Sequence, residues 1–378
     1  MAPTILPSLV ELTQKLIRIP SGNPPGEEER IARFAADWLG AAGVESQIIP
    51  LEPGRSSLVA RVCGERPESV VLCGHLDTVP TESDAWSVPP FEGRVVDGRL
   101  WGLGAADMKG GVAVLMHVVA HLARSQVPPR CDVVLALTAD EEVGYRGAAT
   151  VTESGLIDDA KLLLIAEPSS GHVYTGQKGE LWIEIAVHGH EAHGSTPGFG
   201  TNAILPAARL CARIEEEIAA LPEIAGRGRT TLNVGRFDGG RRVNIVPDHA
   251  VAHFDVRITR PEDRDAVLAR VDRIGEEEAS RVGARFKRRV LSDHAPIAGT
   301  SDMTDRLVQA IVKVSGKRPA IGISPFSTDA VSIVPRLDLP VLIYGPGEIA
   351  RAHRQDESIA LEELRVAYEV LRRFLTRA

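Results

Sequence analysis

Acidic and imidazole side chains follow several apolar runs of this sequence, at the point where each run ends. The run 69–73 leads into Gly-His-Leu-Asp, so His75 and Asp77 stand two residues apart and, in an extended chain, point to the same side. A metal-binding imidazole needs an acceptor for its second nitrogen, and a carboxylate two residues on can supply it. The same spacing also suits an ordinary hydrogen bond at a strand end, so the pair alone leaves both interpretations open.

A further carboxylate lies in the glycine-rich stretch 102–111, GLGAADMKGG, which leads into an apolar helical pattern. Its glycines are partly those of the G-x-G-x-x-G turn that binds dinucleotides, but Asp107 replaces the third glycine and would repel a pyrophosphate. The preceding strand and the downstream ribose-binding acid are also unconvincing. A carboxylate on a glycine-rich turn at a helix entrance is better explained as a ligand that approaches a cation closely.

Three consecutive acids, Asp140, Glu141 and Glu142, follow the apolar run 132–138. Carboxylates at the end of a buried strand are costly unless they are solvated, protonated or bound to cations. A solvated loop is the ordinary interpretation of such a cluster. Neighbouring carboxylates also allow the division of labour that a hydrolase requires, with one on a metal and one moving a proton.

Two more candidates complete this pattern. Glu167 ends the apolar run 161–166, and His353 follows the loop that begins Gly345-Pro346-Gly347. Either residue alone would be ordinary. Ligands of open α/β sheets gather at the carboxyl ends of the strands, so the repeated placement of an acid or histidine after an apolar run predicts one common site.

The elements that must position these residues alternate along the first part of the chain. Apolar spacing predicts two opening helices, and short β-branched runs then alternate with helical stretches, which favours a largely parallel or mixed sheet covered by helices. The predicted elements are helices over 9–19, 31–38 and 111–124 and strands over 57–63, 69–73, 132–138 and 161–166.

A second domain is inserted from about residue 178. Its predicted order is β-α-β-β-α-β, the ferredoxin-like split unit, after which the first pattern resumes. We therefore predict an α/β fold with a catalytic domain over 1–177 and 292–378 and an inserted domain over 178–291. The elements of the inserted domain are strands 181–187, 231–237, 250–258 and 284–290 and helices 202–221 and 262–281, followed in the resumed domain by helix 302–314, strand 341–344 and helix 359–375.

Composition limits the class of protein. The 378 residues are 44% hydrophobic, enough for at least two cores, and 43 basic against 51 acidic residues give a net charge of −8. This charge disfavours nucleic-acid partners, and the one dense basic cluster, 285–289, is interpreted as a solvated strand edge. The amino terminus shows neither a signal peptide nor a membrane anchor. Four scattered cysteines without a C-x-x-C pair indicate free thiols, so we expect a soluble cytoplasmic protein without a membrane partner.

Taken in order, the motifs resemble those of the two-zinc aminoacylase and carboxypeptidase family, which contains acetylornithine deacetylase, succinyl-diaminopimelate desuccinylase and glutamate carboxypeptidase. The similarity runs nearly end to end and implies a mixed-sheet zinc-hydrolase domain with an inserted dimerisation domain. The motifs that carry it are GHLDTVP from residue 74 to residue 80, GAADMKGG, TADEE, AEP, EAHGSTP, VNIVP, DVR and GPG.

The resemblance also implies a ligand set. Asp107 would bridge two ions, His75 and Glu167 would complete one site, and Glu142 and His353 would complete the other. Carboxylate oxygens and imidazoles suit Zn²⁺ independently of the resemblance, with Co²⁺ or Mn²⁺ as substitutes.

The family further implies roles for residues around the ions. Glu141 would be the general base, Asp77 would orient His75, and the peptide between Asp107 and Met108 would be a non-proline cis bond.

Residues of the inserted domain and of the last loop would serve the substrate. His193 would reach across a homodimer to the developing oxyanion. Asn244, Arg257 and Gly345 are expected to bind substrate, and the planar fork of Arg257 suits a carboxylate. For Arg257 a surface salt bridge is the alternative.

The loop GPGEIARAH, 345–353, looks more like acetylornithine deacetylase than the desuccinylase. It predicts hydrolysis of an N-acyl amino acid, or of a short peptide, that carries a free carboxylate. A carboxypeptidase or dipeptidase would use the same metal core, so the core leaves this alternative open. A non-catalytic binding protein on the same scaffold is a third interpretation, although a decayed site would be expected to have lost some of the ligands.

Overall fold

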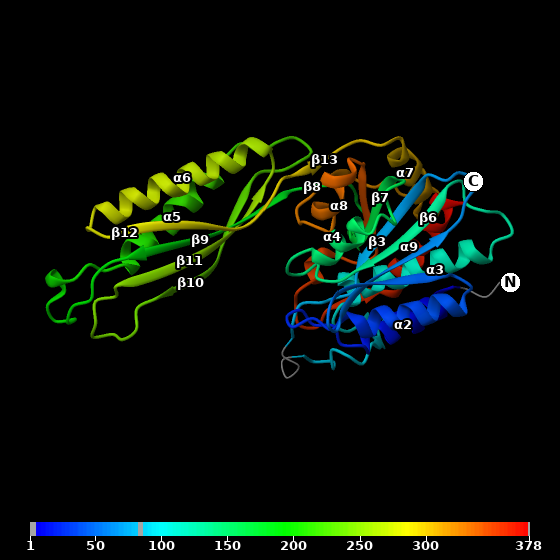
Figure 1. Ribbon diagram of the computed structural model, residues 1–378, viewed down its shortest axis with the longest axis horizontal. Coiled ribbons are helices and arrows are strands. Elements are labelled where there is room, and N and C mark those ends of the chain that lie inside the picture. Colours follow the sequence, from blue (N-terminus) through cyan, green and yellow to red (C-terminus); the bar gives the residue numbers. More distant parts are fainter. Residues whose placement is uncertain (1–4, 82–85, 377–378) are drawn as a thin grey trace. The chain divides into compact units, whose positions relative to one another are not determined.

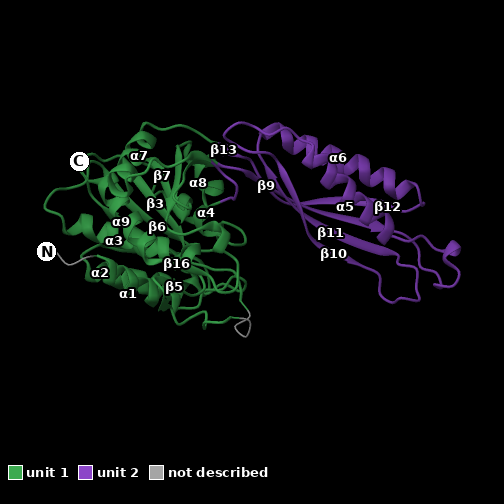
Figure 2. Ribbon diagram, turned by 180° about the vertical axis from the view of Figure 1, so that it is seen from behind, with its two compact units in different colours: residues 1–176, 298–322, 328–378 green, residues 177–297, 323–327 purple. Residues whose placement is uncertain are grey.

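The computed structural model describes residues 5–81 and 86–376 (Figure 1). The chain divides into two compact units, which Figure 2 shows in different colours. Unit 1 contains residues 1–176, 298–322 and 328–378, and unit 2 contains residues 177–297 and 323–327. The short return of 323–327 to unit 2 has no signal in the sequence pattern.

Unit 1 is built on a mixed sheet, which confirms the predicted fold class. Four strands at its centre run parallel, and antiparallel strands flank them. The strand order is β1-β2-β6-β3-β7-β15-β8-β13, with β14 beside β8. The strands are β1 (Ser46–Glu52), β2 (Arg55–Val62), β3 (Ser69–His75), β6 (Asp132–Thr138), β7 (Ala160–Pro168), β8 (Val173–Gln177), β13 (Ile297–Ala298), β14 (Ile321–Ser324) and β15 (Val341–Gly345).

Helices cover both faces of this sheet. Alternate residues of the central strands, such as Val70 and Leu72, are buried in one core with the helices α1 (Leu6–Ile17), α2 (Glu28–Ala41), α3 (Gly110–Arg124), α7 (Asp302–Ser315) and α9 (Leu361–Leu375). The shorter helices α4 (Arg146–Glu153) and α8 (Ala330–Leu337) pack together and contact β6 and β7 respectively. A small sheet of order β16-β5-β4 completes the unit, from β4 (Arg94–Val96), β5 (Arg99–Trp101) and β16 (Ser358–Ala360).

Unit 2 has the predicted β-α-β-β-α-β order. Its antiparallel sheet has the order β10-β11-β9-β12, and α5 and α6 pack against each other and against this sheet. Leu181, Ile183 and Ile185 of β9 are fully buried in the core of this unit. Arg285 and Arg289 are exposed on β12, an edge strand, as expected for the basic cluster. The elements are β9 (Gly179–His188), α5 (Ile204–Ala219), β10 (Thr231–Gly239), β11 (His249–Ile258), α6 (Pro261–Ser280) and β12 (Arg285–His294).

The described helices include none that is both long and apolar enough to span a bilayer. Cys63, Cys73, Cys131 and Cys211 are all free thiols, as the sequence predicts.

Candidate metal centre

The parallel strands bring the predicted ligands to one edge of the sheet. His75 is the last residue of β3, Glu167 lies next to the end of β7, and Glu142 lies in the loop that follows β6. Because β3 pairs in parallel with both β6 and β7, their carboxyl ends meet. Asp107 joins them from the turn η2 (Ala105–Lys109), and His353 from the loop after η4 (Ile349–Arg351).

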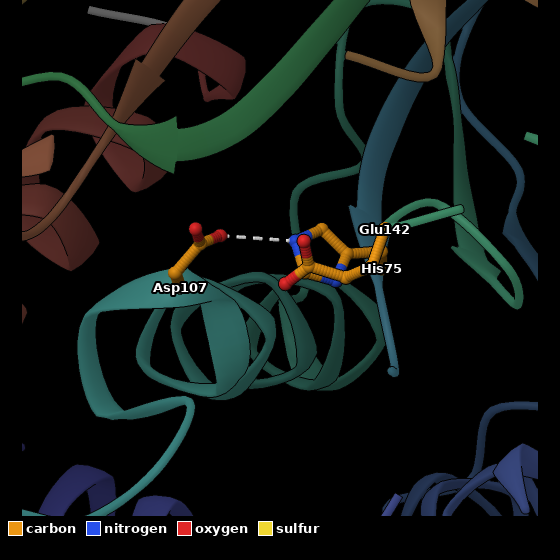
Figure 3. A group of neighbouring side chains, drawn as sticks. All are labelled: His75, Asp107 and Glu142. Carbon is orange, nitrogen blue, oxygen red and sulfur yellow. Dashed lines mark hydrogen bonds and ion pairs between the residues drawn. The ribbon is translucent and has the colours of Figure 1, made fainter. Parts of the chain in front are cut away.

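Asp107 lies between two pairs of ligands. Its Oδ1 is 3.0 Å from His75 Nε2, and its Oδ2 is 3.3 Å from His353 Nε2. Glu167 Oε1 lies 3.6 Å from His75 Nε2, and Glu142 Oε2 lies 2.9 Å from His353 Nε2. Figure 3 shows the side chains of His75, Asp107 and Glu142 next to each other, and one atom of each lies within 4.8 Å of the others. The structure thus assembles all five predicted ligands in two groups that share one carboxylate.

Local backbone geometry explains how Asp107 reaches this place. The peptide between Asp107 and Met108 is cis, as the resemblance implied. The glycines that follow allow α3 to begin close to the sheet, since a Cβ on Gly111 would lie 2.4 Å from the carbonyl oxygen of Ala166, one residue before Glu167. The glycine-rich stretch therefore places the aspartate beside the end of β7.

Asp77 positions both the histidine and the acidic loop. His75 Nδ1 lies 3.0 Å from the main-chain oxygen of Asp77 and 3.6 Å from its carboxylate, so the nearer acceptor is the backbone carbonyl rather than the expected side chain. The carboxylate of Asp77 instead accepts hydrogen bonds from the backbone N–H groups of Glu141 and Glu142, each at 3.1 Å, and from Asn23 Nδ2 at 2.9 Å. One buried side chain thereby fixes the backbone that carries the proposed base and a proposed ligand.

The electrostatics of the cluster favour an added cation. Burial raises the pKa of Glu141 and Glu167 well above their usual range, and the pKa of Glu142 is raised as well. Burial also acts to raise the pKa of Asp107, but hydrogen bonds from His353 and His75 hold it well below its usual range. A divalent cation would relieve the crowding of these carboxylates.

An unused ligand atom supports the same conclusion. Glu142 Oε1 is buried and has no hydrogen-bond partner among the residues that the structure describes, whereas Oε2 of the same carboxylate faces His353. Buried polar atoms normally have a partner, and a carboxylate oxygen is a good ligand for a divalent ion. The residues present therefore fit a metal centre.

We expect the thermal stability of the chelated protein to fall as the pH rises from 6.5 to about 10. Hydrogen bonds to Asp107 and Glu142 raise the pKa of His353 to about 10, and carboxylates raise that of buried His75 despite its burial. Both groups hold more protons folded than unfolded, so their contribution is complete below the unfolded pKa and is lost on passing the folded one. Thermal melts recorded with chelator should show a melting temperature that falls with pH. The same melts with added Zn²⁺ should show a smaller fall. A flat profile with chelator would contradict this charge balance.

The predicted substrate residues of unit 2 fall into two places. His193 and Asn244 are exposed on neighbouring loops, where Gly194 N donates to the carbonyl of Asn244 at 2.8 Å and His193 Nδ1 lies 2.7 Å from Ser195 Oγ. Arg257 lies near the end of β11, with Nη1 3.1 Å from Glu180 Oε2 and Nε 2.9 Å from Asp255 Oδ1. The pair with Glu180 is not a surface salt bridge, because 24% of the Arg257 side chain and 2% of that of Glu180 are exposed, and the contact of Arg257 with substrate stays a prediction.

Gly345 lies within unit 1 at the end of β15. A Cβ there would lie 2.0 Å from the carbonyl oxygen of Ala166 and 2.6 Å from that of Glu167, so the close approach of two strands requires a glycine. This packing accounts for the residue, and its role in substrate binding also stays a prediction.

Two buried polar residues of the site, Asn23 and Glu357, were not identified from the sequence. Asn23 donates to both Asp77 and Asp140, and Glu357 accepts hydrogen bonds from the turn that carries Asp107. The position of Glu357, four residues after His353, is the one signal that could have indicated it.

Comparison with known proteins identifies the family. The pattern of Peptidase family M20/M25/M40 matches residues 71–377. The chain belongs to this family. It is 31% identical to the acetylornithine deacetylase of Photorhabdus laumondii, over 94% of this chain and 93% of that protein. It is 29% identical to a probable succinyl-diaminopimelate desuccinylase of Staphylococcus epidermidis, over 93% of this chain and 92% of that protein.

Solved structures with the same fold include a tripeptidase from Staphylococcus aureus, with a TM-score of 0.82, 23% identity and coverage of 98% of this chain and 97% of that one. Another is an M20 family metallo-carboxypeptidase from Sulfolobus solfataricus, with a TM-score of 0.80, 17% identity and coverage of 97% and 98%. The resemblance to the aminoacylase and carboxypeptidase family is thus confirmed. As a member of family M20/M25/M40, the protein is a hydrolytic enzyme that acts on amide bonds and depends on a divalent metal.

Proposed function

We propose that this enzyme uses two zinc ions to hydrolyse the amide bond of an N-acyl amino acid. The observation that carries the proposal is the carboxylate of Asp107, whose two oxygens face two different histidines, each beside a further glutamate. Such a shared carboxylate suits two ions at short separation. The names of the relatives, a deacetylase and a desuccinylase, support an N-acyl amino acid as substrate.

The ligands would be His75, Asp107 and Glu167 for one ion and Asp107, Glu142 and His353 for the other. Ions bound there supply Lewis acidity to the amide carbonyl and lower the pKa of water.

Glu141 is suited to move the proton in this reaction. Burial raises the pKa of its carboxyl group well above the usual range, so that it can accept a proton from water and return it to the leaving nitrogen. The carboxylate of Asp77 accepts a hydrogen bond from the backbone N–H of Glu141 and so orients the residue that would act as the base.

Residues of unit 2 would complete the site through a homodimer. The loop that carries Asn244 lies just before β11, which begins at His249, whereas Arg257 lies near the end of this strand. Eight residue steps of about 3.4 Å separate Arg257 from His249 by roughly 27 Å. A small substrate cannot contact both ends of one strand. We therefore propose that the pair His193 and Asn244 and the single Arg257 serve one substrate from different protomers.

Arg257→Lys is expected to raise KM for substrates with a free carboxylate by about 10-fold or more, since a bidentate contact would become a single one. The value of kcat should change less. Arg236→Lys, in the same unit on β10, is the control, because Arg236 pairs with Asp238 on the surface. An unchanged KM would assign Arg257 to its ion pairs with Glu180 and Asp255 alone.

The substrate class is tested by a screen with added Zn²⁺ or Co²⁺. N-acetylornithine, N-succinyl-diaminopimelate and a set of dipeptides separate the proposed deacylase from a carboxypeptidase or dipeptidase with the same metal core. Faster turnover of dipeptides than of any N-acyl amino acid would favour the peptidase alternative, which the fold of the tripeptidase and carboxypeptidase neighbours also permits. Protein that binds two ions and hydrolyses none of these compounds would favour a binding protein.

The four free thiols are compatible with a reducing compartment, and we propose a cytoplasmic enzyme on that ground.

A further inference from the structure

Glu357 makes an unusual set of contacts with the turn that carries Asp107. Its side chain is buried, and its Oε1 accepts hydrogen bonds from the backbone N–H groups of Ala106 at 2.7 Å and Asp107 at 2.9 Å. Its Oε2 accepts a hydrogen bond from Gly104 N at 2.9 Å. Its main-chain oxygen also accepts from Gly102 N at 3.0 Å. Both acceptor groups of one residue are thus directed at the same turn.

Burial of a carboxylate in this position costs free energy, so we expect it to make contacts that a neutral side chain could not make. Glu357 forms no salt bridge within the described chain, but three N–H dipoles point at its carboxylate and the buried ammonium of Lys109 attracts it electrostatically. Burial, and after it the negative charge of Asp107, raises the pKa of Glu357 to about 8, although the N–H groups of the turn oppose this shift. Three convergent N–H groups nevertheless match the acceptor capacity of a carboxylate better than that of an amide.

The position of Glu357 in the chain links two ligands that come from distant segments. It follows His353 by four residues and directly precedes β16, whose Ser358 pairs with Trp101 of β5. The residue is therefore anchored to the small sheet on one side and to the turn of Asp107 on the other. This connection joins the segments that carry Asp107 and His353, whose Oδ2 and Nε2 atoms lie 3.3 Å apart.

We propose that Glu357 is a positioning residue for the metal centre, which holds the Asp107 turn at the distance from His353 that one shared ion requires. This inference rests on the proposed two-metal function and assigns no contact between Glu357 and the ions. Residues that orient metal ligands typically change metal affinity by about 10- to 100-fold when they are replaced. A residue that only stabilised the turn would lower the melting temperature without changing affinity.

The test is Glu357→Gln, which keeps the shape of the side chain but replaces one acceptor oxygen with a donor that faces backbone N–H groups. We expect apoprotein of this variant to bind Co²⁺ about 10- to 100-fold more weakly at one of its two sites, with an altered visible spectrum of the bound Co²⁺. Competition with a chromophoric chelator measures the affinity, and circular dichroism with a thermal melt reports folding separately.

Glu363→Gln is the matched control. Glu363 is a partly buried glutamate of the same segment that accepts a hydrogen bond from Ala360 N at 3.1 Å and forms no hydrogen bond with the described residues of the Asp107 turn. Its substitution should leave Co²⁺ affinity and spectrum unchanged. Glu357→Asp provides a second variant if Glu357→Gln does not fold, because it keeps the charge but withdraws the carboxylate by one methylene, and its affinity should also fall.

Unchanged Co²⁺ affinity and spectrum in a folded Glu357 variant would overturn the proposal, whatever the effect on melting temperature. The affinity comparison does not depend on turnover, so it supports or overturns the role of Glu357 whichever substrate the enzyme cleaves. Wild-type protein that takes up no divalent ion would overturn this proposal together with the metal centre.

Discussion

Replacing Glu141 with glutamine is expected to lower kcat by about 10²- to 10⁴-fold while both ions stay bound. The amide cannot accept the proton of water, but it keeps the size of the side chain. Glu141 lies outside the two ligand groups around Asp107, and its backbone N–H is held by Asp77, so the metal centre should keep its geometry. Steady-state kinetics and metal analysis of the same preparation measure both quantities.

Glu142→Gln is the natural comparison, because it changes the next residue in the same way. Glu142 lies 2.9 Å from His353, and its second oxygen has no partner within residues 5–81 and 86–376, so this substitution should reduce metal content as well as activity. Near-normal turnover by Glu141→Gln would rule out Glu141 as the base, and loss of ions from that variant would make it a ligand instead.

Asp107→Asn is expected to have the largest effect on metal content. The asparagine has one oxygen and no charge, so it cannot serve both His75 and His353 groups as the carboxylate does. We expect the variant to retain fewer ions per chain than either Glu167→Gln or Glu142→Gln, each of which alters one group, and to lose measurable hydrolysis. Metal analysis after gel filtration and Co²⁺ titration of apoprotein measure this order.

The ranking of the three variants by metal content tests whether Asp107 is shared between two ions. Equal losses in all three would mean that the ions bind as one cooperative unit rather than through a shared carboxylate. Two ions retained by Asp107→Asn would show that Asp107 is not shared at all and would contradict the proposed centre.

Sequence patterns alone predicted that most of the proposed ligands would gather at one edge of a sheet, and the physical reason is local. His75 and Glu167 lie at the ends of apolar strands, where a period of two and the parallel arrangement dictate which edge they reach. Helices and strands with strong periodicity were likewise predicted. The sequence analysis did not predict the short helices α4 and α8 or the strands β1, β4, β5, β8, β13, β14 and β16. Helix α8 contains Pro335, and α4 has eight residues, too few for a clear helical pattern.

Other features depend on contacts that no local pattern encodes. Glu357 is an ordinary acid in the sequence, and its function appears only when the turn of Asp107 presents three N–H groups to it. The placement of Asn244 and Arg257 near opposite ends of β11 follows from the position of one strand, whereas the resemblance implied only that both residues bind substrate. The preference of His75 for a backbone carbonyl rather than a carboxylate is likewise a matter of tertiary geometry.

The hydrogen bonds of Asp77 have a consequence for how the substrate preference of this protein could change. Because Asn23, Glu141 and Glu142 all donate hydrogen bonds to one buried carboxylate, the acidic loop cannot change its shape for a new substrate without releasing the proposed general base. Substitutions that change the substrate preference of this protein are therefore expected in parts of the chain that this anchor does not reach. The chemical step can stay constant while the choice of acyl group and amino acid evolves around it.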